Sequence, residues 1–454
     1  MKNGVAIASS RGPLGTSRGA LARGLSAALT SLVTLSSLPA TLAAQDTDRA
    51  PSGTPVALEE LISAAHEENA DLDLARATLS QARSQADEAR ARLLPSFVAT
   101  GSYQRNEIQV QVQLSADRIA TITPYDQLDA RFALNVPILD LSAWASFFSA
   151  EASGDAASGR ADQAVDDVEV AVTQLYYSLV AGRAMIESAE RSRLVAEQAL
   201  AFATARREAG VAPLSEVARA EAEALRARQM QQEAELQVTL AERNLVNLTG
   251  VDLRGRALAP LEGADTSTLE PLEDYLDEID ELPATRAARQ DVLAAERGVH
   301  AAWLGLAPTV AGSAAERVTN AAGFGPSNLW TLNVTATWQL DFGRPAAIGT
   351  RDAVLATTRA RLERAEQQAR LQIEDAWHRA HALAARLETT EAVLAASTRA
   401  AEDTRARYEV GVASQLELVQ AERDLFSAEV SRTQARADLA VARATLRIRS
   451  HRAR

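Results

Sequence analysis

The chain has 454 residues, a formal net charge of -13 and a hydrophobic content of 47%, with only 4% aromatic residues. This acidity argues against nucleic-acid binding, because surfaces that bind phosphate are basic. Cysteine is absent and lysine occurs only at Lys2, which excludes disulfides, thiolate metal sites and the lysine that a P-loop or Schiff-base enzyme needs. We therefore expect no enzyme, no cofactor and no metal site.

The first 44 residues have the features of a secretory signal peptide. A basic region is followed by an uncharged, mostly apolar or small stretch at 25–38, then by small residues, and polarity returns at Gln45. This order predicts export and cleavage after Ala43 or Ala44. Cleavage after Ala44 removes four basic residues and no acidic ones, which changes the net charge from -13 to -17. No other stretch is apolar for long enough to form a membrane-spanning helix.

The rest of the chain contains two copies of one unit. The sequence Gly-Val-Ala occurs at 210–212 and again at 411–413, and the same offset of 201 relates Leu-Asp at 139–140 to Leu-Asp at 340–341. Pro95 and Pro308 are instead 213 apart, so the segment between Pro95 and Asp140 carries 12 extra residues. We assign 45–250 and 284–454 to the two repeats and the Gly-, Pro- and acid-rich segment 251–283 to the connection between them.

Each repeat is predicted to run as helix, β-hairpin, very long helix, turn and helix. The first helix, 58–94, has apolar residues at helical spacing and stops at Pro95. The hairpins are placed at about 96–140 and 309–341, and the long helices at about 143–248 and 346–447, each pair broken by a Gly-Val turn. A helix of about 65 residues is roughly 100 Å long, which favours coiled-coil packing.

The predicted hairpins alternate between apolar and polar residues. The alternation covers 108–114 and 132–138 in the first repeat and 330–340 in the second, where the polar residues are uncharged. A soluble strand with one face in a core shows the same pattern, but no partner sheet is evident here, and about ten residues suit a tilted membrane strand. Four strands cannot close a barrel with a lumen, and open sheet edges are not stable in lipid. Several chains must then share one barrel.

Together these elements resemble the TolC-like outer-membrane factor (outer membrane efflux protein) family over about 56–447. The most specific signatures are Arg-Glu-Ala-Gly-Val at 207–211 with Glu216, and Tyr-Glu-Val-Gly-Val at 408–412 with Glu417. The resemblance implies a mainly α fold with a membrane β-barrel contribution, in which a homotrimer forms a 12-stranded β-barrel in outer-membrane lipid above a long α-helical periplasmic barrel. Its implied partners are a periplasmic adaptor (membrane fusion protein) and an inner-membrane RND or ABC pump.

The resemblance also implies roles for residues at the helix turns. Gly210, Val211, Gly411 and Val412 match the turns that an adaptor grips. Glu417 matches an acidic ring at the periplasmic gate, and Tyr408 matches a tyrosine that bonds the acidic position of Glu216. The sequence departs from the family pattern in two places, because Ala413 stands where some relatives have an arginine and Gln420 replaces a second ring acid.

Simpler interpretations remain open for these residues and for the chain. The two turn glycines serve as helix C-caps in any case, and first-turn glutamates stabilise a helix N-terminus without any gate. The main hypothesis for the whole chain is a passive outer-membrane exit duct of a tripartite efflux or type I secretion system, whose acidic balance favours cations. The alternative is a soluble periplasmic coiled-coil adaptor or scaffold protein.

Overall fold

A computed structural model of the chain describes residues 55–115, 118–259, 269–339 and 342–451. The predicted signal peptide, 1–44, and the second Leu-Asp junction, 340–341, lie outside these ranges. The first half contains α1 (Leu58–Glu68), α2 (Ala70–Ala91), β1 (Ser96–Arg105), β2 (Val110–Ser115), β3 (Arg118–Thr123), β4 (Asp126–Leu139), α3 (Leu141–Glu208) and α4 (Leu214–Thr249). The second half contains α5 (Leu272–Leu276), the short 3₁₀ helix η1 (Ile279–Glu281), α6 (Pro283–Leu304), β5 (Thr309–Thr319), β6 (Asn328–Thr337), α7 (Gly343–Glu409) and α8 (Gln415–Ser450).

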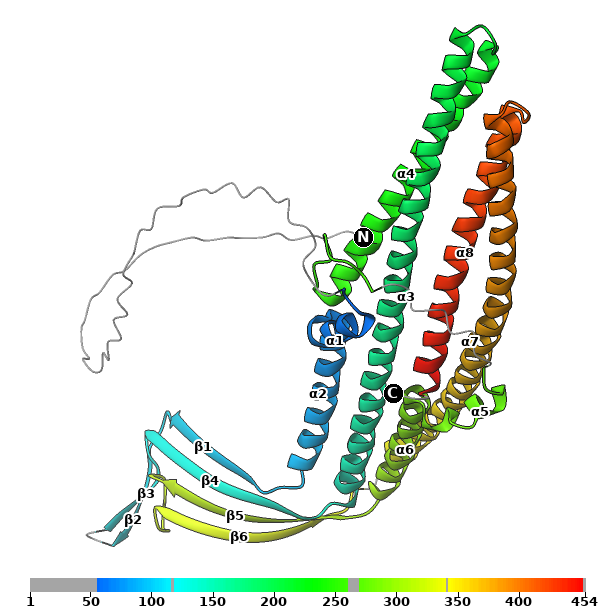
Figure 1. Cartoon of the computed structure of the whole chain (residues 1–454). Coiled ribbons are helices and arrows are strands. Elements are labelled where there is room, and N and C mark those ends of the chain that lie inside the picture. Colours follow the sequence, from blue (N-terminus) through cyan, green and yellow to red (C-terminus); the bar gives the residue numbers. More distant parts are fainter. Residues whose placement is uncertain (1–54, 116–117, 260–268, 340–341, 452–454) are drawn as a thin grey trace, which may run out of the picture. The chain divides into compact units, whose positions relative to one another are not determined.

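Both halves follow the predicted order, and each contains one very long helix, α3 or α7 (Figure 1). Helices α3 and α7 have 68 and 67 residues, which corresponds to about 100 Å each, and each packs along the helix that follows it, α4 or α8. Asp140, which belongs to the repeated Leu-Asp sequence, caps the start of α3, since its carboxylate accepts a hydrogen bond from the backbone N–H of Ala143 at 2.9 Å. None of the described helices is both long enough and apolar enough to cross a bilayer.

The leading helix of the first half is interrupted, so the prediction of one continuous helix over 58–94 was wrong. The break lies at Asn69, whose side-chain oxygen accepts hydrogen bonds from the backbone N–H groups of Asp71 (2.9 Å) and Leu72 (3.2 Å). Its amide also donates to the carbonyl of Leu248 at the end of α4, at 3.1 Å. Asn69 therefore caps the start of α2 and bonds to a residue 179 positions away, and these contacts break the continuous helix that the apolar periodicity predicted.

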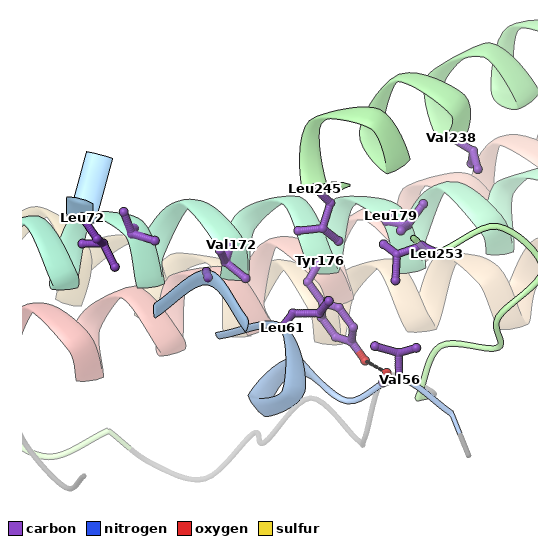
Figure 2. Packing of buried hydrophobic residues seen from close by; sticks show 11 residues of the cluster. Val56, Leu61, Leu72, Val172, Tyr176, Leu179, Val238, Leu245 and Leu253 are labelled. Atoms are coloured by element: carbon purple, nitrogen blue, oxygen red, sulfur yellow. Dashed lines mark hydrogen bonds between the residues drawn. The ribbon is translucent and has the colours of Figure 1, made fainter. Parts of the chain in front are cut away.

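A buried apolar cluster anchors the start of the described chain on α3 (Figure 2). Tyr176 and Leu179 of α3 pack with Leu61 of α1 and Leu245 of α4, and the Tyr176 hydroxyl lies 3.3 Å from the carbonyl oxygen of Val56. Fully burying a side chain of this size stabilises the fold by about 1.5–3 kcal/mol. A second cluster joins α5 and η1 to α7, through Ile279 and its neighbours.

Four strands form one antiparallel sheet in the order β1-β4-β5-β6, so β4 and β5 join the two halves of the chain. The prediction of 108–114 as a strand of the main hairpin was wrong. This segment forms β2, which pairs with β3 in a separate ribbon, while β1 is the partner of β4. Twenty residues separate β1 from β4 and eight separate β5 from β6, so the ribbon contains the 12 extra residues of the first repeat.

The sheet has one apolar and one polar face, because partners in the ladder lie on the same face. The pairs Phe97↔Leu134 and Ala314↔Leu332 belong to the apolar face, whereas Ser313↔Asn333 belongs to the polar face. The alternation predicted over 330–340 is therefore observed in β6 only as far as Thr337, where the strand ends. β1 was missed because its apolar positions include Ala99 and Gly101, which weaken the pattern.

Candidate functional site

The candidate site consists of the two turns that join the long helices, residues 209–213 (the first turn) and 410–414 (the second turn). Both turns use the same helix-ending motif. Gly210 and Gly411 adopt left-handed φ angles of 76° and 78°, and their N–H groups donate to carbonyls three residues back, both at 2.9 Å. The N–H groups of Val211 and Val412 donate to carbonyls five residues back, also at 2.9 Å. These paired bonds define the Schellman motif, for which glycine is preferred because it lacks a Cβ.

The two turns differ in how the next helix begins. In the second turn, the Ser414 hydroxyl accepts a hydrogen bond from the N–H of Glu417 (3.3 Å), and the Glu417 carboxylate accepts one from the N–H of Ser414 (2.6 Å). This reciprocal capping box satisfies two free N–H groups of α8. In the first turn, Pro213 occupies the equivalent position and its side chain makes no capping bond.

The capping box also determines the charge state of Glu417. The hydrogen bonds from the backbone and side chain of Ser414 hold the pKa of Glu417 below its usual range, and Arg407 adds to this effect. Glu417 is exposed at the surface of the chain. The lowered pKa favours the charged carboxylate, and Glu417 performs the capping role that was considered as the simpler interpretation.

Glu216, the counterpart of Glu417 in the first turn, faces a different environment. Its carboxylate lies 3.3 Å from the guanidinium of Arg206, and its side chain is only 17% exposed. The Arg206 guanidinium also lies over the ring of Phe202, 5.9 Å from the ring centroid. The negative charge of Glu216 is thus neutralised inside the chain.

Tyr408 of α7 packs against this arrangement. Its ring meets the ring of Phe202 edge to face, with centroids 5.4 Å apart and an interplanar angle of 68°. Burial raises the pKa of Tyr408, the Glu216 carboxylate raises it further, and Arg206 opposes the shift. Among the described residues Tyr408 makes no hydrogen bond to Glu216, so the implied Tyr408–Glu216 bond is replaced by the Arg206–Glu216 ion pair.

Ala413 and Gln420, where the sequence departs from the family pattern, have clear surroundings. Ala413 is buried with Tyr408 and Leu418 in a small apolar cluster at the second turn. Gln420 donates to the carboxylate of Asp424, one helical turn further along α8, at 3.1 Å. Neither residue provides a charged tie to another helix of the described chain.

Among the ion pairs that join the two halves of the chain, two lie on the long helices nearest the turns. The Arg423 guanidinium of α8 contacts the Glu223 carboxylate of α4, with Nε to Oε1 at 2.7 Å. Arg191 of α3 lies 3.1 Å from Glu429 of α8. Burial raises the pKa of Glu223, but the guanidinium groups of Arg423 and Arg226 outweigh it and leave the pKa lowered.

Sequence reasoning missed these ion pairs because their members are 200 or more residues apart and do not occupy equivalent repeat positions. Only a contact between the two repeats, which no local pattern encodes, brings them together. In the part of the chain that the structure covers, no three histidine, cysteine or acidic side chains are grouped so that they could hold a metal ion.

The outer surface of both turns is apolar. Five valine and leucine side chains there are between 63% and 74% exposed. They belong to the two turns and to the first residues of α4 and α8: Val211, Leu214, Val410, Val412 and Leu416. Such a group of exposed apolar side chains is typical of an interaction surface. Val211 and Val412, predicted as docking residues, belong to it.

Comparison with known proteins gives a consistent result. The family model described as "Outer membrane efflux protein" matches residues 61–251 and 278–448. A membrane protein from Pseudomonas aeruginosa is similar in structure, with 22% identity and a TM-score of 0.74 over 87% of this chain and 93% of that chain. No curated protein sequence matches.

Two further solved structures have the same fold. The outer membrane protein VceC of Vibrio cholerae has 19% identity and a TM-score of 0.72, over 87% of this chain and 95% of that chain. The open state of the MtrE outer membrane channel of Neisseria gonorrhoeae has 21% identity and a TM-score of 0.73, over 87% and 88% of the two chains.

Proposed function

Because the chain belongs to the outer membrane efflux protein family, we propose that it is the passive exit duct of a tripartite efflux or type I secretion system, assembled as a trimer and opened at its helix turns by a partner. As a family member it is an efflux channel of the bacterial outer membrane that extends into the periplasm. Its role is to conduct cargo, and we assign it no catalytic function.

The unpaired edges of the sheet support assembly of several chains. The sheet ends at β1 on one side and β6 on the other, and every residue of both strands is exposed. In lipid, each unpaired backbone N–H and C=O group would cost several kcal/mol, so β1 of one chain must pair with β6 of another. Three chains supply twelve strands, which close a barrel around a lumen.

The apolar turn surface supports docking of a periplasmic partner. Val211 and Val412 are exposed at the ends of helices that are themselves about 100 Å long, far along the chain from the sheet. An adaptor (membrane fusion protein) that covers these side chains would remove them from water and connect the duct to an inner-membrane RND or ABC pump. Gly210 and Gly411 hold the valines in position through their left-handed φ angles.

The contacts between the two helix pairs support a closed gate. Tyr408 packs on Phe202, and Arg423 pairs with Glu223, so both contacts must break if the two pairs move apart. Glu216 holds Arg206 against Phe202 and thereby supports the first contact. A partner opens the gate only if it binds the separated arrangement more tightly than the joined one. In a trimer, Glu417 would contribute a ring of three charges at the opening.

The exposed apolar face of β6 argues against the alternative of a soluble scaffold. Trp330, Leu332 and Val334 are 71–75% exposed and lie on one face of the strand. In water, three such neighbours would form an aggregation-prone edge. In lipid, the same face is stabilised.

Reconstitution tests this function. The chain is expressed with its leader, membranes are fractionated, and the detergent-purified protein is inserted into a planar bilayer. We expect the protein in the outer-membrane fraction and discrete conductance steps without an added energy source. Recovery of the protein in the soluble periplasm, together with the absence of conductance, would overturn the proposal in favour of the scaffold.

A further inference from the structure

The two faces of the four-stranded sheet carry three charged residues each, but their net charges have opposite signs. The apolar face holds one basic and two acidic residues, and the polar face holds two basic and one acidic. Those of the apolar face are Arg105, Asp126 and Glu316, and those of the polar face are Asp129, Arg131 and Arg317. With two arginines and one aspartate, the polar face carries a net charge of +1 in each chain. On the apolar face, Arg105 pairs with Asp126 at 2.8 Å.

The two arginines of the polar face lie directly opposite each other. Arg131 of β4 and Arg317 of β5 are partners in the ladder, two positions from the pair Asp129↔Thr319 that ends it. This end of the ladder is the one remote from the helices, since β4 runs from it towards α3. At about 3.4 Å per residue the arginines lie about 7 Å inside that end of the ladder.

Only one of these arginines is neutralised. The Asp129 carboxylate accepts a hydrogen bond from Arg317 Nε at 2.7 Å and also contacts its terminal nitrogen. Arg131 is exposed and, among the described residues, has no carboxylate within ion-pair distance. Like charges directly opposite each other destabilise a sheet, so this pair is favourable only where water or an anion screens it.

We infer that Arg131, supported by Arg317, forms a positively charged ring inside the outer mouth of the duct that favours anions over cations. The inference rests on the proposed function, because the polar face lines a lumen only in the closed barrel. Three chains place three unneutralised Arg131 guanidinium groups at one height. The ring would bind small anions and acidic cargo, because the guanidinium groups attract negative charge as the cargo leaves the duct.

This section of the duct is opposite in sign to the chain as a whole. The net charge of -13 predicts a lumen that favours cations, and the exposed Glu417 carboxylate belongs to that acidic part. The barrel wall near its outer end differs from this acidic average. Apart from Asp129, Arg131 and Arg317, its polar side chains are uncharged amides and hydroxyls, so the two arginines determine its net charge. An anion released past the acidic helices thus meets an attractive site at the exit.

Selectivity measurements on the reconstituted protein test the inference. Reversal potentials are recorded in a KCl gradient for the wild type and for Arg131→Gln. We expect the variant to lower the chloride-to-potassium permeability ratio by about twofold near 0.1 M salt, and by more at 0.01 M, where the Debye length is about 30 Å. The matched control is Glu316→Gln, which removes a charge of the opposite sign from the adjacent position on the lipid-facing side and should not lower the ratio.

Two further measurements guard against misfolding of the variant. Arg131→Lys keeps the charge and should keep the wild-type ratio. In the wild type, tripolyphosphate added on the barrel side should block current at lower concentration than when added on the helix side.

Two results would overturn the inference without contradicting the proposed duct. One is a chloride-to-potassium permeability ratio that is equal in the conducting wild type and Arg131→Gln. The other is equal block by tripolyphosphate from both sides. Absence of any conductance in the wild type would instead overturn the proposed function, and this inference with it.

Discussion

The first and second turns have the same backbone but different electrostatic surroundings. Each turn ends a long helix with a glycine, at a φ angle of 76° in the first turn and 78° in the second. In both turns a glutamate follows six residues after the glycine. Yet Glu216 pairs with Arg206 and is mostly buried, whereas Glu417 caps its own helix and is exposed. The difference arises where the next helix begins, because Pro213 of the first turn corresponds to Ser414 of the second.

This comparison shows how one repeated sequence acquires two roles. Proline cannot provide a capping hydroxyl, so the carboxylate of the first turn is available for Arg206. Serine captures the carboxylate of the second turn and keeps it at the surface. We propose that the first turn braces the contact between the helix pairs and that the second turn carries the charge of the gate.

The largest expected effect comes from the feature that the two turns share. Gly411→Pro and Gly210→Pro should each abolish export, since proline requires φ near −65° and cannot donate the N–H bond, a cost of about 3 kcal/mol or more. Gly411→Asn, which tolerates the left-handed region, is the matched control and should retain export. Export is measured as the resistance of cells to a toxic cargo or as the amount of cargo secreted into the medium. Equal amounts of outer-membrane protein with unchanged export in the proline variants would contradict the shared role.

The second effect concerns the ion pair that holds the two helix pairs together. Arg423→Gln leaves Glu223 partly buried without its main partner, so the closed arrangement should be weakened and the open probability in bilayers should rise several-fold. Arg254→Gln, which breaks an exposed ion pair with Asp252 away from the turns, is the matched control. Equal open probabilities in the two variants would show that the Glu223–Arg423 pair does not hold the gate closed.

The same ion pair predicts a pH dependence. The pKa of Glu223 is lowered in the closed arrangement, so its stabilisation is complete above the unfolded value of about 4.3 and is lost as the pH falls through the lower folded value. Wild-type open probability should therefore stay flat between pH 6 and 8 and rise in acid. In Arg423→Gln this acid-dependent increase should be absent, because the pair is already broken. A wild-type channel that closes in acid would be inconsistent with this assignment.

A smaller effect separates the two glutamates. Glu216→Gln weakens the hold on Arg206 and removes one of the causes that raise the pKa of Tyr408, so both gating and the ultraviolet titration of Tyr408 should change. Glu417→Gln keeps a side chain that can complete the capping box and removes only the charge, so cation selectivity should fall while stability falls only slightly, by the loss of a charge at the start of α8. Identical phenotypes for the two variants would refute the division of roles.

The smallest effect isolates the cap. Ser414→Ala removes the hydroxyl that caps α8 and keeps the charge of Glu417, which should cost about 1 kcal/mol of stability and leave selectivity intact. Pro213→Ala, at the equivalent position without a side-chain cap, is the control. Denaturant midpoints and reversal potentials measure the two properties separately. A selectivity change in Ser414→Ala without loss of stability would reverse the interpretation.

Much of the fold was predictable, because local chemistry determines it. The Gly-Val turns, the junction between hairpin and helix at Asp140 and the alternation of β6 as far as Thr337 each depend on neighbouring residues, and all were identified from the sequence. The break at Asn69 and the pairing of β1 with β4 were not, since they depend on Leu248 and on strands more than 20 residues away. The Arg423–Glu223 pair was missed for the same reason.

The site was predictable only in part. Sequence similarity placed Glu216, Tyr408 and Glu417 at the turns, but it implied a Tyr408–Glu216 bond where Arg206 intervenes. Which acid is neutralised and which remains exposed depends on Pro213 and Ser414, whose effect is visible only when both helix starts are compared.

The mass of the assembled protein tests the central claim most directly. Native mass spectrometry of protein extracted in detergent from outer membranes should give a complex of three chains, because only pooled strands leave no unpaired edge at β1 and β6. A single chain that is recovered without detergent and stays folded in water would contradict the account.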